Sequence, residues 1–244
     1  MKPIIKTDFH YQNQESKRKI SAFHSTAMQQ LSIDLASLFK FSFQQYKSYA
    51  SFIIGAVLTF IVLAVVPQVY FMLRVPEEPT LETQFVSFLL TAVQIFLSLG
   101  FIKLMLLLVQ DAPVSVADMF NNFGIFFSYF VASFIYGLAV SVGLLLLIAP
   151  GIWIAIRFQF FPYFIIENGD SSFTALQKSY NLSQDLLLEL FVFGVAVVFL
   201  NIIGALLFGV GVILTYPLTT MATAVIYRSL IEESDAIPAD SYRA

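Results

Sequence analysis

The sequence lacks cysteine altogether, and it has only two histidines. Without cysteine the chain can form no disulfide, no thiolate nucleophile and no cysteine-ligated zinc site. His10 and His24 both lie before the first long apolar segment, so they cannot supply a membrane metal site of histidines and carboxylates. We therefore expect neither a metal ion nor a cofactor.

Charged residues are also scarce. They make up 12% of the 244 residues, about half of what a soluble domain usually carries. The net charge of −3 is too small to indicate a nucleic-acid partner, and the basic residues do not alternate with aromatic ones as a single-strand groove requires. Hydrophobic residues instead reach 58%. This balance is typical of an integral membrane protein.

Six apolar stretches, each about long enough to cross a bilayer, account for this composition. A transmembrane helix needs roughly 20 predominantly apolar residues. We thus predict an all-α fold, a polytopic membrane bundle of six transmembrane helices with short amphipathic interfacial helices on the cytoplasmic side. Pro162 is expected to kink the short fourth stretch, and Pro217 the sixth. The stretches are 49–73, 84–109, 123–148, 152–167, 186–208 and 212–230.

The positive charges indicate how these helices lie in the membrane. Eleven of the thirteen Lys and Arg residues fall on one side, and the exceptions are Arg74 in an outer loop and Arg157 within a stretch. Basic residues stay on the cytoplasmic side of bacterial membrane proteins. We predict a multi-pass protein of the bacterial inner membrane with both termini in the cytoplasm. Residues 1–48 would form a cytoplasmic tail with an amphipathic helix, 49–231 the membrane domain, and 232–244 a second tail.

Two of the outer turns are predicted to be tight, which forces antiparallel neighbours. Pro150-Gly151 is expected to join the third and fourth stretches, and Gly209-Val210-Gly211 the fifth and sixth. Each outer hairpin follows a short amphipathic segment, and such segments lie in the membrane interface. Three copies of one unit, or chance similarity of apolar runs, both explain this pattern.

The amphipathic segments carry their own signals. The first places Leu38 and Tyr46 on its apolar face. The second begins at Ser115, with Asp118 three residues later as in a capping box. The third aligns an apolar face opposite Gln177, Lys178, Asn181 and Asp185, and that face consists of Phe173, Leu176 and Tyr180.

Small residues recur every four positions in two of the stretches. Ser51 and Gly55 line the first, and Ser133 and Gly137 line the third. Such stripes let helix backbones approach closely. They predict helix packing, either within one chain or between two copies of it.

Arg157 is the most costly residue in the apolar segments, because a charge within the membrane must face protein or water. It lies about six residues from the expected outer turn, or roughly 9 Å deep. We predict a buried polar cluster around Arg157 that includes Asn201, Tyr216, Tyr136 and Ser141. The cluster could lock hairpins together or bind an anionic group such as a lipid phosphate. Alternatively, Arg157 could extend to the outer headgroups.

No catalytic residues can be assigned. The chain has no intramembrane Ser–His pair, no metal-binding His–Glu motif and no glycine loop for phosphate. The sequence therefore predicts a protein that is not an enzyme.

The run from Leu147 to Ser183 carries a family resemblance, with Pro150-Gly151, Pro162, Glu167 and Ala175-Leu176 followed by Ser179. With the upstream Val114–Phe120 segment, it resembles the YciC-like group of uncharacterised bacterial inner-membrane proteins. It is also similar to the membrane domain joined to some glycerophosphodiester phosphodiesterases. The resemblance implies a multi-helix inner-membrane protein linked to lipid or envelope chemistry. It transfers no catalytic residue, and function does not follow from fold.

These observations favour a non-enzymatic scaffold, assembly factor or accessory factor of the cell envelope. Its partners would be membrane lipids, and other inner-membrane proteins or a second copy are further candidates. One alternative is a transporter or channel for a small solute, lined by Arg157, Asn201, Tyr216 and Gln94. Another is a lipid-binding membrane protein that uses Arg157.

Overall fold

The computed structural model describes residues 35–74, 80–184, 186–206 and 211–236. Throughout these ranges the regular structure is helical, and no strand occurs among them. The all-α prediction is confirmed. Residues 1–34 of the predicted tail, the outer loop at 75–79, Asp185, most of the predicted turn at 209–211 and the end of the chain from 237 lie outside the described residues.

The first helix pair follows a short amphipathic helix. Helix α2 (Leu35–Ser48) buries Ser42 and Tyr46 and packs against the last helix of the chain. The next helix is continuous from Ala50 to Arg74 but changes its hydrogen-bond pattern in the middle. It consists of α3 (Ala50–Phe60), the π-helical turn η1 (Ile61–Val65) and α4 (Val66–Arg74). Its partner is α5 (Leu81–Val109), which starts with Thr80 as N-cap.

The second pair begins after the short 3₁₀ helix η2 (Val116–Met119). The predicted capping box is confirmed, because the Ser115 N–H donates to Oδ2 of Asp118 at 2.8 Å. Helix α6 (Phe123–Leu146) then pairs with α7 (Ile148–Phe158), which is followed by α8 (Phe161–Asn168). The fourth predicted stretch is therefore two helices, with a break at residues 159–160.

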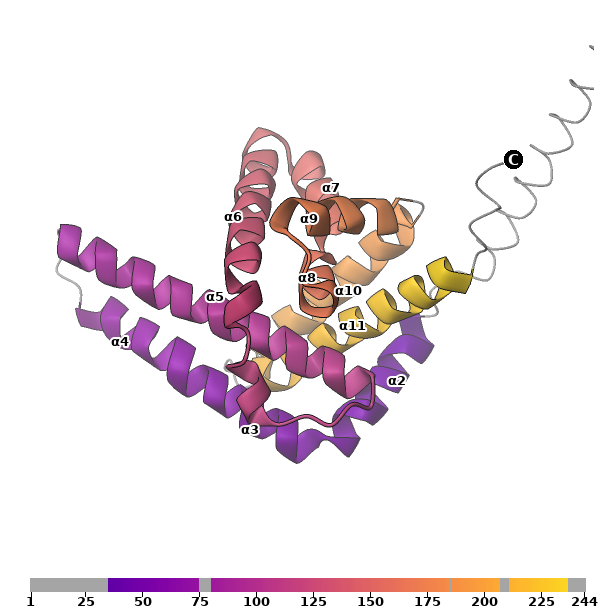
Figure 1. Ribbon diagram of the computed structural model, residues 1–244, viewed down its shortest axis with the longest axis horizontal. Helices are drawn as coiled ribbons and strands as arrows, with labels where there is room; N and C mark the ends of the chain where they lie inside the picture. Colours follow the sequence, from indigo (N-terminus) through magenta and orange to yellow (C-terminus); the bar gives the residue numbers. More distant parts are fainter. Residues whose placement is uncertain (1–34, 75–79, 185, 207–210, 237–244) are drawn as a thin grey trace, which may run out of the picture.

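The third pair follows α9 (Ser172–Leu182) and consists of α10 (Leu187–Leu206) and α11 (Val212–Ala236). Figure 1 shows that these pairs do not form one parallel bundle. The α4–α5 hairpin and the α6–α7 hairpin point away from the centre in different directions, and α11 runs through the middle of the molecule.

Five helical segments are long and apolar enough to cross a membrane: Ala50–Arg74, Leu81–Val109, Phe123–Leu146, Ile148–Asn168 and Leu187–Leu206. The chain is thus an all-helical protein with the helices of a multi-pass membrane protein. Helix α11 occupies the sixth predicted stretch but is not among the five. Other helices surround it, since α2, α3, α5 and α10 all pack against it.

The turn between α6 and α7 lies earlier than we predicted. Leu147 alone has extended backbone between the two helices, and Pro150-Gly151 belongs to the first turn of α7. Gly151 instead brings the two helices together, because a Cβ atom on Gly143 would lie 2.8 Å from its Cα atom. Gly204 and Gly211 make a similar close approach between α10 and the start of α11.

The small-residue stripes are not where these helices approach most closely. A Cβ atom on Gly55 or Gly137 would meet nothing within 4 Å. Ser51 and Gly137 are exposed, whereas Gly55 and Ser133 are half-buried. Within the described chain, Gly55 and Gly137 therefore do not mediate close helix contacts, whereas Gly143, Gly151, Gly204 and Gly211 do.

Helix α9 packs against its neighbours through small side chains. Ser172, Ala175, Leu176 and Ser179 are buried, whereas Phe173 is 72% exposed. The face that contacts protein therefore shares only Leu176 with the apolar face that we expect at the membrane interface. The small side chains bring α9 close to its neighbours, and the serine hydroxyls are needed there, as shown below.

We expect Gly143→Ala to destabilise the protein by about 1–3 kcal/mol, the usual cost of overpacking. The added methyl group would overlap the α7 backbone at Gly151. Gly137→Ala, in the same helix but with open space around it, is the matched control and should melt at or above the wild-type temperature. Thermal unfolding in detergent, followed through the single tryptophan, measures both. Equal melting temperatures for the two variants would contradict the packing.

Candidate functional site

The break between α7 and α8 is the most unusual backbone feature of the apolar segments. Pro162 has no N–H to donate, and its ring would clash with the carbonyl of Phe158 in a continuous helix. Helix α7 accordingly ends at Phe158, and α8 begins at Phe161 with the proline in its first turn. The expected kink at Pro162 is therefore a complete interruption, which leaves backbone groups without helical partners.

Two serines of the α9 region supply the missing partners. The Ser179 hydroxyl donates to the carbonyl oxygen of Arg157 at 3.0 Å and accepts from the N–H of Phe160 at 3.0 Å. The Ser183 hydroxyl also lies 3.0 Å from the Arg157 carbonyl oxygen. Both serines are fully buried. Because an unsatisfied buried backbone group costs about 1–3 kcal/mol, α9 is what makes the break tolerable.

The side chain of Arg157 lies at this break, between α7 and α9. Its Cζ atom is 4.8 Å from the ring centroid of Tyr180 and 5.4 Å from that of Trp153. The two rings meet at 71° with centroids 6.0 Å apart, so they form a corner around the cation. Cation–π contacts of this kind are worth roughly 0.5–2 kcal/mol.

Two of the three guanidinium nitrogens of Arg157 lack a hydrogen-bond partner among the described residues. Arg157 is only 7% exposed, and its Nε and Nη1 atoms are buried without an acceptor there. The Nε2 atom of Gln159, within the break, is likewise buried and unpaired. Among the described residues no carboxylate forms an ion pair with Arg157. Three buried donor nitrogens at the break are therefore without an acceptor in the part of the chain that the structure describes.

Asn201 belongs to a separate polar group between α10 and α11. Its amide donates to Oγ1 of Thr219 at 3.2 Å and to the carbonyl of Val197 at 2.9 Å, and its oxygen accepts from Thr215 at 3.1 Å. Tyr216 stacks on Phe101 of α5, with centroids 5.4 Å apart. These contacts hold α10 and α11 together, and they use both hydrogens and the oxygen of the Asn201 amide.

Tyr136 and Ser141 lie elsewhere on α6. The Tyr136 hydroxyl donates to the carbonyl of Ala155 at 3.4 Å, which links α6 to α7. Ser141 is exposed. Within the described ranges, no hydrogen bond, ion pair or ring contact joins Arg157 to Asn201, Tyr216, Tyr136 or Ser141. The residues that we expected in one cluster thus have separate partners.

Arg157 also lies farther from the outer turn than we expected. Counting from Leu147 instead of Pro150-Gly151 gives ten residues, or about 15 Å of helix. That distance exceeds the reach of an arginine side chain, so Arg157 does not extend to the tip of the hairpin. It contacts α9 instead, whose Lys178 pairs at 2.7 Å with Asp170 in the segment before that helix.

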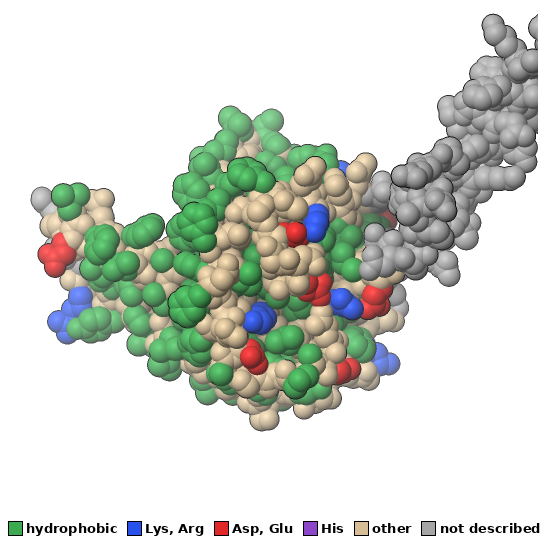
Figure 2. Space-filling view, viewed as in Figure 1, with side chains coloured by type: hydrophobic (Ala, Val, Ile, Leu, Met, Phe, Trp, Pro, Cys, Tyr) green, Lys and Arg blue, Asp and Glu red, His purple; other side chains and the backbone are tan. Residues whose placement is uncertain are grey.

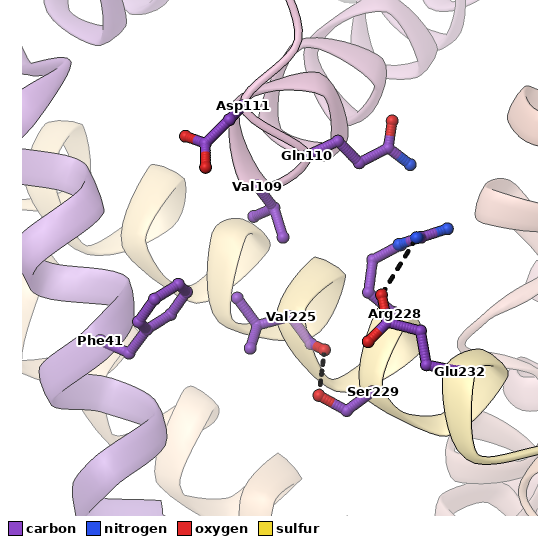
Figure 3. A pocket seen from close by; sticks show the side chains of 8 residues that line it. All are labelled: Phe41, Val109, Gln110, Asp111, Val225, Arg228, Ser229 and Glu232. Carbon is purple, nitrogen blue, oxygen red and sulfur yellow. Dashed lines mark hydrogen bonds and ion pairs between the residues drawn. The ribbon is translucent and has the colours of Figure 1, made fainter. Parts of the chain in front are cut away.

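A second polar group joins α5, α8 and α11 at their charged ends. Glu167 accepts from the hydroxyl of Tyr227 at 2.8 Å, from Arg228 at 3.3 Å and from the amide of Gln110. Beside it is an open pocket of about 340 Å³ between the middle of α2, the end of α5 and the second half of α11. Figure 3 shows its walls, with Phe41 and Val109 facing Val225 and with Arg228 paired to Glu232.

The polar side chains of this pocket already have partners. Arg228 binds Glu167 and Glu232, Ser229 donates to the carbonyl of Val225, and Asp111 accepts from Tyr49 at 3.3 Å. The pocket is therefore a structural junction. Of the pocket and the α7–α8 break, only the break has buried donors without acceptors among the described residues.

Comparison with known proteins gives no relative: the chain matches no protein-family model, no curated protein and no solved structure. In the described part of the chain, no three histidine or acidic side chains lie together in a way that could hold a metal ion.

The sequence singled out Arg157 but not the residues that contact it. The sequence analysis named Ser179 and Ser183 only within the run that carries the family resemblance, and it assigned neither of them a contact with the fourth stretch. One signal was present: a proline and an arginine in one apolar stretch require outside partners, and Ser179 and Ser183 recur four residues apart in the next helix.

We expect Ser179→Ala to lower the free energy of unfolding by about 1–3 kcal/mol, because the buried Phe160 N–H loses its acceptor. Ser183→Ala is the matched control. It leaves that acceptor in place, and the Arg157 carbonyl keeps Ser179, so its cost should be clearly smaller. Denaturation of both variants in detergent measures the difference. A larger loss for Ser183→Ala would contradict the role of Ser179.

Proposed function

We propose that this chain is a non-enzymatic integral protein of the bacterial inner membrane that crosses the bilayer six times, with both termini in the cytoplasm. The observation that carries this is the separation of charge. The charged residues of α2, of η2, of the ends of α5 and α8, and of α9 fall at one end of the helix pairs, and Arg74 and Glu82 fall at the tip of the α4–α5 hairpin. Figure 2 shows one small charged group at that tip and the others on the opposite half.

The sixth crossing would be α11. A helix enclosed by other helices can be less apolar than one that faces lipid, because protein covers its polar groups. Met221, Ala222, Ala224 and Ile226 of α11 are all buried. The Asn201 group satisfies Thr215 and Thr219 at its outer part. These contacts support a membrane position for α11 despite its lower hydropathy.

The amphipathic segments would lie in the cytoplasmic interface. Helix α2 exposes Lys40 and Lys47 while it buries Tyr46, and α9 exposes Phe173 beside its Lys178–Asp170 pair. Such helices sit at the headgroup level with apolar side chains directed into the membrane. This position would place the charged ends of all three helix pairs at the inner surface.

An accessory or scaffolding role is supported by what the hairpins leave uncovered. Only 22% of the apolar window in Ala50–Arg74, and 17% in each of Phe123–Leu146 and Leu187–Leu206, is buried inside the molecule. The diverging hairpins thus present large apolar surfaces to lipids, other inner-membrane proteins or a second copy. Membership of the YciC-like group, which rests on the Leu147–Ser183 run, is part of the same proposal.

The contacts do not favour the transporter alternative. Gln94 is exposed, and Asn201 has all its partners between α10 and α11. In the part of the chain that the structure describes, no polar contact connects these residues to Arg157. A continuous polar lining is what a solute pathway would require.

Cysteine labelling tests the six-crossing topology directly, because the chain has no cysteine of its own. Three variants each carry one cysteine as the labelling site: Lys40→Cys, Arg74→Cys and Ser229→Cys. In intact spheroplasts a membrane-impermeant maleimide should label position 74 alone, whereas positions 40 and 229 should react only after lysis. Labelling of position 229 in intact spheroplasts would mean five crossings and would overturn the proposal.

Reconstitution tests the non-enzymatic, non-transporting role. Liposomes that contain the purified protein should retain trapped potassium and glucose as long as protein-free liposomes do, and their phospholipids should stay intact by thin-layer chromatography. Empty liposomes and a pore-forming peptide serve as controls. Efflux or headgroup release that disappears in Asn201→Ala or Arg157→Met would contradict the proposal.

A further inference from the structure

We propose that Arg157 and the aromatic corner of Trp153 and Tyr180 form a binding site for a phosphate oxyanion, carried by a lipid headgroup or present as a free ion. The inference deepens the proposed function and rests on it, because α9 must lie at the cytoplasmic interface for a headgroup to reach the break. Its starting point is the cost of leaving a buried guanidinium unpaired.

A guanidinium keeps its charge and has five N–H donors. At 7% exposure, Arg157 has lost most of its water, yet Nε and Nη1 find no acceptor among the described residues. A buried charge without a partner is strongly unfavourable. The aromatic faces attract the cation but do not replace oxygen acceptors for these donors. An anion that accepts from two nitrogens at once would offset the cost.

The guanidinium and the exposed side of the Trp153–Tyr180 corner indicate which class of anion would bind. Oxygens of a phosphate group match the spacing of guanidinium nitrogens, which is why arginine is favoured at phosphate sites. Trp153 is 41% exposed on α7, so the corner opens at the surface that would face lipid. The apolar side chains along the α6–α7 hairpin can meet acyl chains while the headgroup meets Arg157.

The serine contacts explain why the site is already formed. Ser179 and Ser183 fix the Arg157 backbone, and Ser179 also fixes Phe160, so the break cannot close into a continuous helix. Tyr180 lies one residue from Ser179 on α9, and the same helix therefore holds both the backbone and the ring. A rigid, preformed arrangement lowers the entropy cost of binding.

The experiment uses delipidated full-length protein in detergent and follows its thermal unfolding. Added phosphatidylglycerol should raise the wild-type melting temperature, and diacylglycerol with the same chains, which lacks the phosphate, should not. At 100 times the Kd the folding equilibrium constant should rise about 100-fold. A separate titration with inorganic phosphate distinguishes the sources: a matching rise there assigns the site to a free anion.

Arg157→Met should abolish the response to both probes. Without ligand this variant should be at least as stable as the wild type, because it removes an unpaired buried charge. Arg74→Met is the matched control, since Arg74 also lies over a tyrosine, 5.5 Å from the Tyr70 centroid, but is exposed. Its response should equal that of the wild type.

Two outcomes would overturn the site. The first is an equal rise, or none, in wild type and Arg157→Met. The second is a large loss of stability in Arg157→Met and in Asp185→Asn without ligand, which would show that a carboxylate of the chain already pairs with the arginine. If Arg157→Met does not fold, native mass spectrometry of the wild type decides: no preference for phosphatidylglycerol over diacylglycerol ends the proposal. Failure of this site would leave the cysteine-labelling result, and hence the topology, unaffected.

Discussion

Backbone hydrogen bonding at the α7–α8 break is the constraint on which the middle of this molecule depends. In a hydrocarbon environment every N–H and C=O must find a partner within the protein. Pro162 interrupts the helical hydrogen bonds at the break. The Ser179 hydroxyl, from the neighbouring helix α9, bonds the Phe160 N–H and the Arg157 carbonyl instead. That requirement fixes where α9 lies, how closely it packs, and which of its faces is buried. It also determines that Tyr180 stands beside Arg157.

The amount of apolar surface that a helix exposes depends on how many other helices pack against it. Helix α11 is covered on several sides, so threonines and an asparagine partner can satisfy one another there without exposing polar groups. The hairpins α3–α5 and α6–α7 diverge and remain strongly apolar on their outer faces. The lower hydropathy of the sixth stretch thus accompanies its contacts with protein, whereas the other five stretches leave more apolar surface uncovered.

Sequence reasoning recovered what depends on local chemistry. The helical class, the positions of the apolar segments and the Ser115–Asp118 capping box follow from periodicity and short-range hydrogen bonds. It failed where long-range contacts decide. Pro150-Gly151 looks like a turn, but Gly151 serves close packing against Gly143. The apolar face of α9 is visible in the sequence, yet the contact of α9 with its neighbours is made mainly by serines and an alanine, which hydrophobic periodicity does not mark. Of the two rings at Arg157, Trp153 lies one helical turn before it on α7, whereas Tyr180 reaches it only through the tertiary contact with α9.

Arg157 differs from the other basic residues of this chain in how it is buried and paired. Most of the described basic side chains that are not at the surface have an acidic or amide partner, as Lys178 has Asp170 and Lys103 has Asn122. Arg157 is more deeply buried than either and lacks such a partner among the described residues. Two aromatic faces reduce the cost of that burial but leave its directional donors unused. Helix α9 satisfies the Arg157 carbonyl, whereas Nε and Nη1 of the same residue have no acceptor among the described residues, and this contrast is what the proposed phosphate oxyanion would resolve.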